Sequence, residues 1–446
     1  MKIAMLTNNY RPFVGGVPVS VERQAVELVR LGHEVTVFAP MYGDSAEEQA
    51  QVLAADERAP ERVIRYGTQK RKMANGMVYP SIYPAEILRT FQTEPFDCIH
   101  VHHPMFVGPC ALLLGKKYQV PVIDTCHTRY EDYLHYIPGL GVSGESPAVK
   151  RHVVRWLRET GVPAYIKWFA NQCDLVLAPS AGMKAVIQGY GVRSRCEVFP
   201  TGLAGEAYCR AEGASARIRK QYGHGKRHLL VTVSRLEREK NYGFLLRGIE
   251  ELRRLLGDAF HVMIVGSGSQ EAELKTKAAV LGISDLVTFV GNVPNSRVKD
   301  YLGAADLFLF ASTSETQGIV LAEAMAAGLP VTAVHAVGSD DIVRDGWNGF
   351  LTEEKEEQWA QKAARILTGE NCRRMKAAAL QTAENYRAST LALYEEMLYN
   401  QCICEKRVRD WRGCSGRMAL QEEIGKGENV YESQTDGREH SAVVLH

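Results

Sequence analysis

The chain has 446 residues, a length at which two domains of ordinary size are expected. Hydrophobic residues make up 46% of it and charged residues 24%, as in a globular protein, and the net charge of +1 provides no basic field for a nucleic-acid partner. The ten cysteines contain no metal-like pair of Cys-x-x-Cys motifs, so we expect reduced thiols in the cytoplasm.

The chain begins with Met1 to Thr7, which lead directly into a strand and do not resemble a signal peptide. Nowhere does an apolar run reach the roughly 18 residues that span a bilayer. Strand-like and helix-like segments then alternate, and the expected ones are Ile3 to Leu6, Val19 to Leu31, Val35 to Ala39, Phe96 to His102, Val120 to Thr125, Leu175 to Ala178 and Glu197 to Gly202. This alternation predicts an α/β domain with a parallel sheet over residues 1–204.

Two short sequences in this domain lie at element ends. Gly15 and Gly16 precede the first helix and permit close approach to its N-terminus, where anions bind, although most Gly-Gly pairs are only turns. His127 follows the strand that begins at Val122, a position where a lone histidine is more often structural than functional.

Three further histidines, His100, His102 and His103, invite a zinc interpretation because imidazole is a common metal ligand. Strand alternation places His100 and His102 on one face and His103 on the other, and no carboxylate or cysteine set completes a site. We therefore predict no metal site here.

Basic and aromatic residues interleave at helical spacing in Lys150 to Arg158 and in Tyr165 to Phe169. One interpretation is a helix lying in an anionic lipid interface. Its candidate contacts are Arg151, Arg155, Trp156, Arg158, Lys167 and Trp168. The alternative is a helix that packs Val154, Leu157 and Trp168 into the first domain while its charges face water.

A second α/β domain is predicted over residues 205–383, with strands at Leu229 to Val233, His261 to Val265, Leu286 to Val290, Leu307 to Phe310 and Val331 to Ala333. The loop after the first of these strands carries Arg235 and Lys240, two cations that could neutralise a diphosphate. The alternative is a solvated loop in which Glu237 and Glu239 pair with them.

The segment from Ser312 to Pro330 is the most informative part of the chain. It runs from a buried strand through a loop carrying Glu315 into a helix carrying Glu323, with Gly318 at the helix start. The first-turn amides at Gly318, Ile319 and Val320 would favour an anion such as a diphosphate. By contrast, the run Gly266-Ser-Gly268 lacks the third glycine of a dinucleotide fingerprint, which disfavours a dehydrogenase.

Taken together, the Glu-x7-Glu spacing of Glu315 and Glu323, with Arg235 and Lys240, resembles the retaining glycosyltransferases of family 4 over roughly residues 1–400. The run Pro121 to Tyr133 and the Ser-Glu-Thr-Gln-Gly loop look like the branch that glucosylates diacylglycerol. The resemblance implies the GT-B fold: two Rossmann-like, doubly wound parallel-sheet domains facing each other across a cleft. It also implies a last helix, about 384–400, crossing back onto the first domain, and we expect residues 401–446 to form a poorly ordered tail.

The same resemblance implies roles for individual residues. Arg235, Lys240 and the amides of Gly318, Ile319 and Val320 would bind the diphosphate, Glu323 the ribose, Val293 the base, Glu315 the hexose, and Gly16 the phosphates or sugar. Val293 is nearly as easily explained as a core residue at a strand end. His127 matches the family histidine that contacts the donor sugar and places the acceptor, so His127 and Glu315 are the catalytic candidates. No metal or other cofactor is expected.

The chain departs from the family pattern in two places. Pro200 to Ala204 reads Pro-Thr-Gly-Leu-Ala where many relatives have Pro-Asn-Gly-Val-Asp. Glu315 to Gly318 reads Glu-Thr-Gln-Gly where Glu-Gly-Phe-Gly is familiar, a change that we expect to alter the hexose side of the pocket.

These observations predict a hexosyltransferase that moves glucose from UDP-glucose to a lipid such as 1,2-diacylglycerol. The expected location is the cytoplasm, peripheral on the inner face of the cell membrane. The alternatives are a hexosyl- or mannosyltransferase with a soluble acceptor, a sugar-nucleotide epimerase, and a binding protein without turnover. The intact set of Glu315, Glu323, Arg235, Lys240 and His127 argues against the last.

Overall fold

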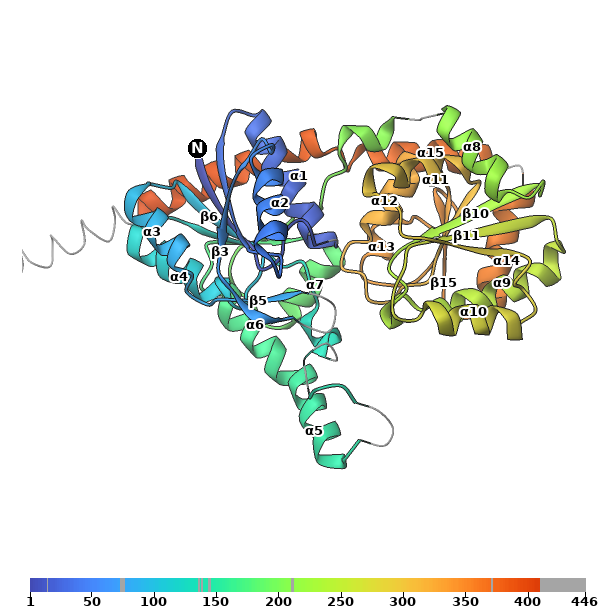
Figure 1. Cartoon of the computed structure of the whole chain (residues 1–446), viewed down its shortest axis with the longest axis horizontal. Helices are drawn as coiled ribbons and strands as arrows, with labels where there is room; N and C mark the ends of the chain where they lie inside the picture. The colour runs from blue at the N-terminus through green and yellow to red at the C-terminus, as the bar shows by residue number, and fades with distance from the viewer. Residues whose placement is uncertain are drawn as a thin grey trace, which may run out of the picture.

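The protein folds into two α/β domains, each built on a parallel sheet (Figure 1). The computed structural model describes residues 1–13, 15–72, 77–134, 137, 139–142, 146–209, 212–369 and 372–409. Within these residues, the chain passes from the first domain to the second near residue 203 and returns near residue 387.

The first sheet has seven parallel strands in the order β3-β2-β1-β6-β7-β8-β9. They are β1 (Lys2–Leu6), β2 (Glu34–Pro40), β3 (Arg62–Tyr66), β6 (Cys98–Val101), β7 (Val122–Thr125), β8 (Leu175–Ala178) and β9 (Cys196–Val198). The helices of this domain are α1 (Gly16–Arg30), α2 (Ala46–Asp56), α3 (Ala85–Thr93), α4 (Val107–Tyr118), α5 (Ala148–Trp156), α6 (Val162–Ala170) and α7 (Ala181–Gly189). Side chains of α3, α4, α6 and α7 bury one face of the sheet, and α1 covers the other. The antiparallel pair β4 (Thr68–Lys72) and β5 (Val78–Pro80) was not predicted.

The second sheet has six parallel strands in the order β12-β11-β10-β13-β14-β15. They are β10 (His228–Val233), β11 (Phe260–Val265), β12 (Val287–Gly291), β13 (Leu307–Phe310), β14 (Val331–Val334) and β15 (Gly349–Thr352). The helices are α8 (Glu212–Tyr222), α9 (Tyr242–Leu256), α10 (Glu271–Val280), α11 (Asn295–Ala304), α12 (Ile319–Ala326), α13 (Ser339–Ile342), α14 (Glu356–Thr368) and α15 (Cys372–Glu384). Helices on both faces explain why these strands are almost wholly apolar.

The C-terminal part of the chain differs from the prediction. After α15 the chain turns, and residues 388–409 form a second helix, which runs back along the first domain (Figure 1). Leu398, Tyr399, Cys402 and Ile403 of this crossing helix are buried against the same sheet face as α1. The tail predicted from residue 401 is therefore wrong for residues 401–409, which are helical and partly buried. Residues 410–446 lie outside the described part of the chain.

The two passages between the domains lie side by side. Leu203 accepts a hydrogen bond from the Ala388 amide at 3.0 Å and donates one to the Tyr386 carbonyl at 2.6 Å. A Cβ atom on Gly202 would lie 2.5 Å from the Cα atom of Ala388, closer than a nonbonded contact permits. Only glycine therefore fits at position 202 without moving the second passage.

We predict that Gly202→Ala lowers the free energy of unfolding by about 1–3 kcal/mol, because the added methyl group forces the two passages apart. Denaturant unfolding compares it with Gly189→Ala, where the new Cβ meets no atom within 4 Å. Equal free energies of unfolding for the two variants would contradict close packing between Gly202 and Ala388.

Candidate active site

Loops from three strand ends meet between the two domains. The loop after β10 carries Lys240, the loop after β13 carries Glu315, and the loop after β7 carries His127. The Thr316 hydroxyl donates a 2.8 Å hydrogen bond to the His127 carbonyl, which ties the second domain to the first. The structure thus brings together both residues predicted to be catalytic, as expected where carboxyl ends of parallel strands face a cleft.

Lys240 and Glu315 form an ion pair whose side chains are only 15% and 17% exposed. Burial by itself lowers the pKa of Lys240, but the Glu315 carboxylate and the Tyr133 hydroxyl outweigh it and raise the pKa above its ordinary value. Burial would raise the pKa of Glu315, but the charge of Lys240 and hydrogen bonds from Lys240 and Ser312 lower it. Both groups are therefore charged at neutral pH.

Tyr133 lies close to this ion pair, although no role was predicted for it from the sequence. Burial raises the pKa of its hydroxyl, and the charges of Lys240 and Glu315 act on the same group. A phenol from the first domain thus lies near the ion pair of the second. The run from Pro121 to Tyr133 carried the signal, but sequence alone does not show which domain Tyr133 would face.

Arg235 lies on the same loop as Lys240 but is more open to solvent. Its side chain is 42% exposed and pairs with Glu239 at 3.1 Å. This is one of the pairings that the sequence allowed as an alternative to phosphate binding. The second acid of that alternative, Glu237, instead accepts hydrogen bonds from the Ser269 amide at 3.1 Å and the Ser269 hydroxyl at 2.6 Å.

Glu323 pairs with a residue that the sequence analysis missed. Arg23, on α1 of the first domain, reaches the Glu323 carboxylate at 2.9 Å and also donates to the Gly202 carbonyl at 3.0 Å. The two side chains are 14% and 16% exposed. A carboxylate offers about four lone-pair sites on its two oxygens. Arg23 occupies one of those on Oε1 of Glu323 and so competes there with the predicted ribose contact.

The N-terminus of α12 has the geometry that the sequence predicts for it. Gly318 caps the helix with φ of +72°, in the left-handed region that favours glycine. Ile319 and Val320 begin the helix and are only partly buried. Gly16 opens α1 in the first domain, and a Cβ atom there would meet no atom within 4 Å. Val293 follows β12 and packs at the edge of the core, so its contact with a base stays a prediction.

The two departures from the family pattern contact each other. Gln317 accepts a hydrogen bond from the Thr201 amide at 2.8 Å and donates one to the Thr201 carbonyl at 3.0 Å. Its side chain is buried. Gln317 thus joins the loop to Thr201 at the passage between the domains. The expectation that the Glu-Thr-Gln-Gly sequence alters the hexose side of the pocket stays a prediction.

His127 is partly buried, and its ring stacks on the ring of His102. Its Nε2 lies 3.0 Å from Nδ1 of His102. Burial lowers the pKa of His127 well below its ordinary value, and the nearby His103 and His100 lower it further, so the ring is neutral at pH 7. His100 and His103 are held by hydrogen bonds to protein groups. Among the described residues, no cluster of three His, Cys, Asp or Glu side chains could hold a metal ion.

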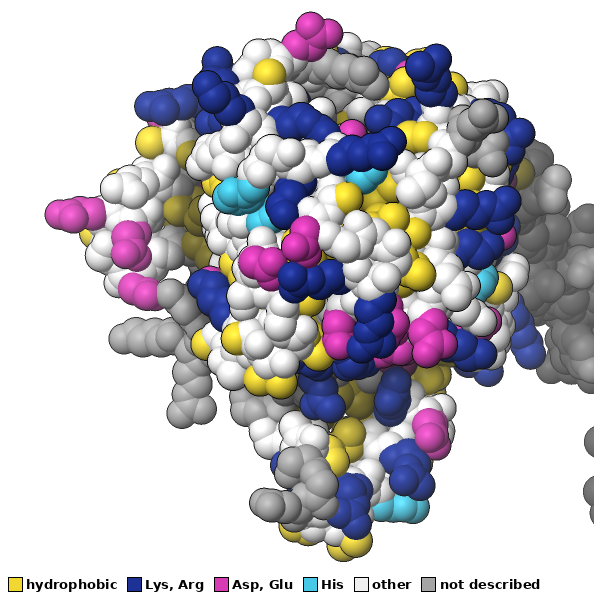
Figure 2. Space-filling model, turned by 90° about the vertical axis from the view of Figure 1, so that its right-hand side faces the viewer, with side chains coloured by type: hydrophobic (Ala, Val, Ile, Leu, Met, Phe, Trp, Pro, Cys, Tyr) yellow, Lys and Arg dark blue, Asp and Glu magenta, His cyan; other side chains and the backbone are white. Residues whose placement is uncertain are grey.

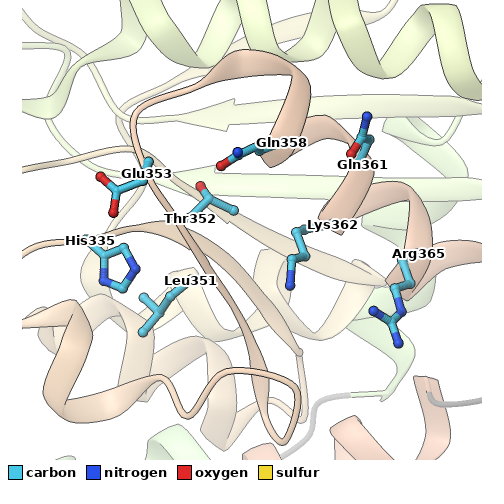
Figure 3. Close-up of a pocket in the computed structure, with 8 residues that line it drawn as sticks. All are labelled: His335, Leu351, Thr352, Glu353, Gln358, Gln361, Lys362 and Arg365. Atoms are coloured by element: carbon cyan, nitrogen blue, oxygen red, sulfur yellow. The ribbon is translucent and has the colours of Figure 1, made fainter.

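Two surface grooves lie apart from these residues. The first, about 510 Å³, is formed by His335, by strand β15 and the residue after it, and by side chains of α14 that include Lys362 and Arg365 (Figure 3). The second, about 530 Å³, lies along the crossing helix beside Leu393 and Met397. Neither groove contains any predicted catalytic or donor-binding residue.

Helix α5 and the π-helical segment Leu157–Gly161 that follows it project from the first domain as an arm, defined here as residues 148–161 (Figure 1). Val149, Val153 and Trp156 are exposed on it, and Trp168 is half exposed nearby. Lysine and arginine side chains lie beside hydrophobic ones on the arm, seen at the bottom of Figure 2. Of the three residues in the packing alternative, Val154 and Leu157 contact the core but Trp168 does not become buried. No helix among the described residues is long and apolar enough to cross a membrane.

Comparisons with known proteins agree with this architecture. Residues 14–204 match the family model of Glycosyltransferase Family 4, and residues 215–382 match that of Glycosyl transferases group 1. The alpha-monoglucosyldiacylglycerol synthase of Streptococcus pneumoniae is 30% identical over 358 residues, covering 79% of this chain and 75% of that protein. The GDP-mannose-dependent alpha-(1-6)-phosphatidylinositol monomannoside mannosyltransferase of Mycolicibacterium smegmatis is 27% identical and covers 78% and 84%, respectively. The crystal structure of Anabaena HepE in complex with UDP has a TM-score of 0.67 at 20% identity, covering 90% of this chain and 100% of that one.

The chain therefore belongs to glycosyltransferase family 4 and is a glycosyltransferase with the GT-B fold. The predicted fold class and enzyme class are confirmed. Its donor, its acceptor and the roles of individual site residues stay predictions at this point.

The Lys240–Glu315 pair predicts a specific dependence of stability on pH. Because the pKa of Glu315 is lowered by folding, its contribution is present above the ordinary glutamate value of about 4.3 and is lost as pH falls through the lowered pKa. Thermal unfolding of wild type, Lys240→Met, Glu315→Gln and the double variant measures the coupling free energy between the two side chains. We expect this coupling free energy to be favourable between pH 5 and 8 and to shrink toward pH 3. A coupling independent of pH would contradict a charged pair.

We predict that Arg23→Ala tightens UDP binding several-fold, because the variant frees a Glu323 oxygen for the ribose. Calorimetry with UDP measures the effect, and Arg23→Lys, which keeps the cation, serves as the matched control. Unchanged or weaker binding in Arg23→Ala would show that Arg23 does not compete with the nucleotide.

Proposed function

We propose that this glycosyltransferase moves glucose from UDP-glucose to the free hydroxyl of 1,2-diacylglycerol, with retention of configuration, while resting peripherally on the inner face of the cell membrane. The observation that best supports a lipid acceptor is the connection between the arm and the cleft. Arg158 of the arm pairs with Asp132 at 3.0 Å, and Asp132 directly precedes Tyr133, which lies near Lys240 and Glu315. A lipid held along the arm would therefore end beside the proposed reaction centre.

The proposed reaction takes place on one face of the sugar. The acceptor oxygen bonds to C1 of glucose as the bond from C1 to the diphosphate oxygen breaks, and that phosphate oxygen takes the acceptor proton. Lys240, Arg235 and the amides at the start of α12 stabilise the departing charge, so the proposal needs no divalent ion. Glu315 and His127 hold the hexose, Glu323 holds the ribose, and Gly16 faces the phosphates when the domains close.

The glucosyl donor and lipid acceptor are favoured by the similarity to the alpha-monoglucosyldiacylglycerol synthase. The similarity to a GDP-mannose-dependent enzyme keeps mannosyl transfer as the second candidate. Incubation with labelled UDP-glucose or GDP-mannose, and with either diacylglycerol vesicles or soluble sugars, separates the alternatives. The proposal expects an organic-phase product from UDP-glucose with an α-anomeric signal in NMR. Labelled product in the aqueous phase alone would support the soluble-acceptor alternative.

We predict that the double variant Arg151→Glu/Arg155→Glu loses binding to anionic vesicles and transfer to diacylglycerol within them. Each basic side chain near an anionic surface contributes on the order of 1 kcal/mol, and reversal makes the contact repulsive. Donor hydrolysis in solution should stay unchanged, because neither residue lies in the cleft. Arg158 is left intact since it pairs with Asp132.

The matched control is Arg217→Glu/Lys220→Glu, which reverses two exposed charges on α8 of the second domain. Vesicle co-sedimentation and product extraction are measured for both variants at low and high salt, because screened surface charges weaken with salt. If the arm variant sediments like the control, the arm is not the membrane contact.

A further inference from the structure

Three imidazole rings form a row that ends at His127. The rings of His100 and His102 lie with centroids 4.1 Å apart and tilted by 37°, and His102 stacks on His127 at 5.3 Å. Nδ1 of His102 lies 3.0 Å from Nε2 of His127. His102 is completely buried. His102 contacts His127 and does not reach the cleft, and the proposed reaction gives it no role.

We propose that His102 is a positioning residue that holds His127 as the tautomer with its proton on Nδ1, so that His127 offers an N–H group to the donor hexose. The use of that N–H rests on the proposed function. The tautomer itself rests on the hydrogen bond between the two rings and on the buried Nε2 of His102.

The argument begins with the shared hydrogen bond. Burial lowers the pKa of both rings well below the ordinary histidine value, so both are neutral and one must donate to the other. Nε2 of His102 is buried and has no hydrogen-bond partner among the described residues. If His127 donated, His102 would carry its proton on this Nε2, leaving a buried N–H unpaired. Such orphaned donors are rarer and more costly than an unpaired acceptor.

The favoured arrangement therefore has His102 donating from Nδ1 to Nε2 of His127. The proton of His127 then resides on Nδ1, which has no hydrogen-bond partner among the described residues. Because His127 is only partly buried, and Thr316 of the opposite domain holds its carbonyl, this N–H belongs to the cleft. A hexose hydroxyl oxygen is a suitable acceptor for it.

The row is anchored from the side away from the cleft. Tyr399 on the crossing helix donates its hydroxyl proton to Glu395 at 2.7 Å. Its oxygen can therefore accept from Nδ1 of His100 at 2.6 Å, and Nε2 of His100 forms a hydrogen bond with the Thr125 hydroxyl, also at 2.6 Å. These bonds fix the plane of His100, and the tilted His102 ring contacts it. The crossing helix thus supports the site without contacting the cleft.

The test uses the full chain labelled with ¹⁵N-histidine, whose long-range ¹H–¹⁵N spectra distinguish a protonated Nδ1 from a protonated Nε2. Loss of a signal in His127→Gln assigns His127. We expect Nδ1–H for His127 in the wild type, a change to Nε2–H in His102→Leu, and retention of Nδ1–H in His102→Asn, whose amide can donate from a similar position. His228→Gln, in the second domain, is the control. A wild-type His127 protonated on Nε2, or no change in His102→Leu, would overturn the proposal.

Kinetics then separate positioning from simple packing. His102→Leu should lower kcat about 10- to 100-fold with little change in KM for the sugar donor, since a misplaced catalytic group costs rate. His102→Asn should recover most of that loss, and thermal unfolding shows whether either variant is folded. If His102→Leu is unstable, the wild-type spectrum together with His102→Asn still decides the tautomer. The expected tautomers without any sugar transfer would refute the proposed function while leaving the positioning role intact.

Discussion

The loop from Ser312 to Gly318 is the constraint on which the site depends, because it bonds to both sides of the cleft at once. Thr316 donates to the His127 carbonyl and accepts from Ser180, and Gln317 exchanges two hydrogen bonds with Thr201. Glu315 directly precedes these anchors and pairs with Lys240. Buried side-chain bonds to backbone groups are satisfied only in one arrangement of the two domains. The arrangement of the two domains is therefore specified by polar contacts and not by apolar area alone.

Local patterns were sufficient to predict much of the fold. Apolar strands such as Leu307 to Phe310 and the glycine at position 318 are read from a few consecutive residues, and both lie where the sequence placed them. β15 and the antiparallel pair β4 and β5 were not predicted, and β4 (Thr-Gln-Lys-Arg-Lys) is polar throughout, without the apolar run that marked the strands that were predicted. The helical residues 401–409 were missed because only Cys402 and Ile403 among them are buried, too few to produce a recognisable period.

The sequence was sufficient to choose the residues of the candidate site, but it did not show which side chains pair with them. Glu315, Lys240 and His127 could be chosen by their place after strand ends, and the structure brings them together. The pairing of Glu323 with Arg23 joins residues 300 positions apart, and nothing in the pattern of α1 marks Arg23 as different from other helix charges. The same holds for His102, whose proposed role rests on a nitrogen without a hydrogen-bond partner among the described residues, a feature that only the three-dimensional structure reveals.

Both carboxylates that we expect to bind the sugar nucleotide are already neutralised by cations of the chain itself. Each pair thus keeps a largely buried carboxylate and its cation without the cost of an isolated charge. In the proposed reaction the diphosphate would take over Lys240, which frees Glu315 to accept hydrogen bonds from the hexose, and the ribose would take over Glu323 from Arg23. The substrate then supplies a new partner for each ion pair that opens. Donor binding on this account is an exchange of partners, so substrate affinity measures the difference between two sets of polar interactions and not the strength of either one.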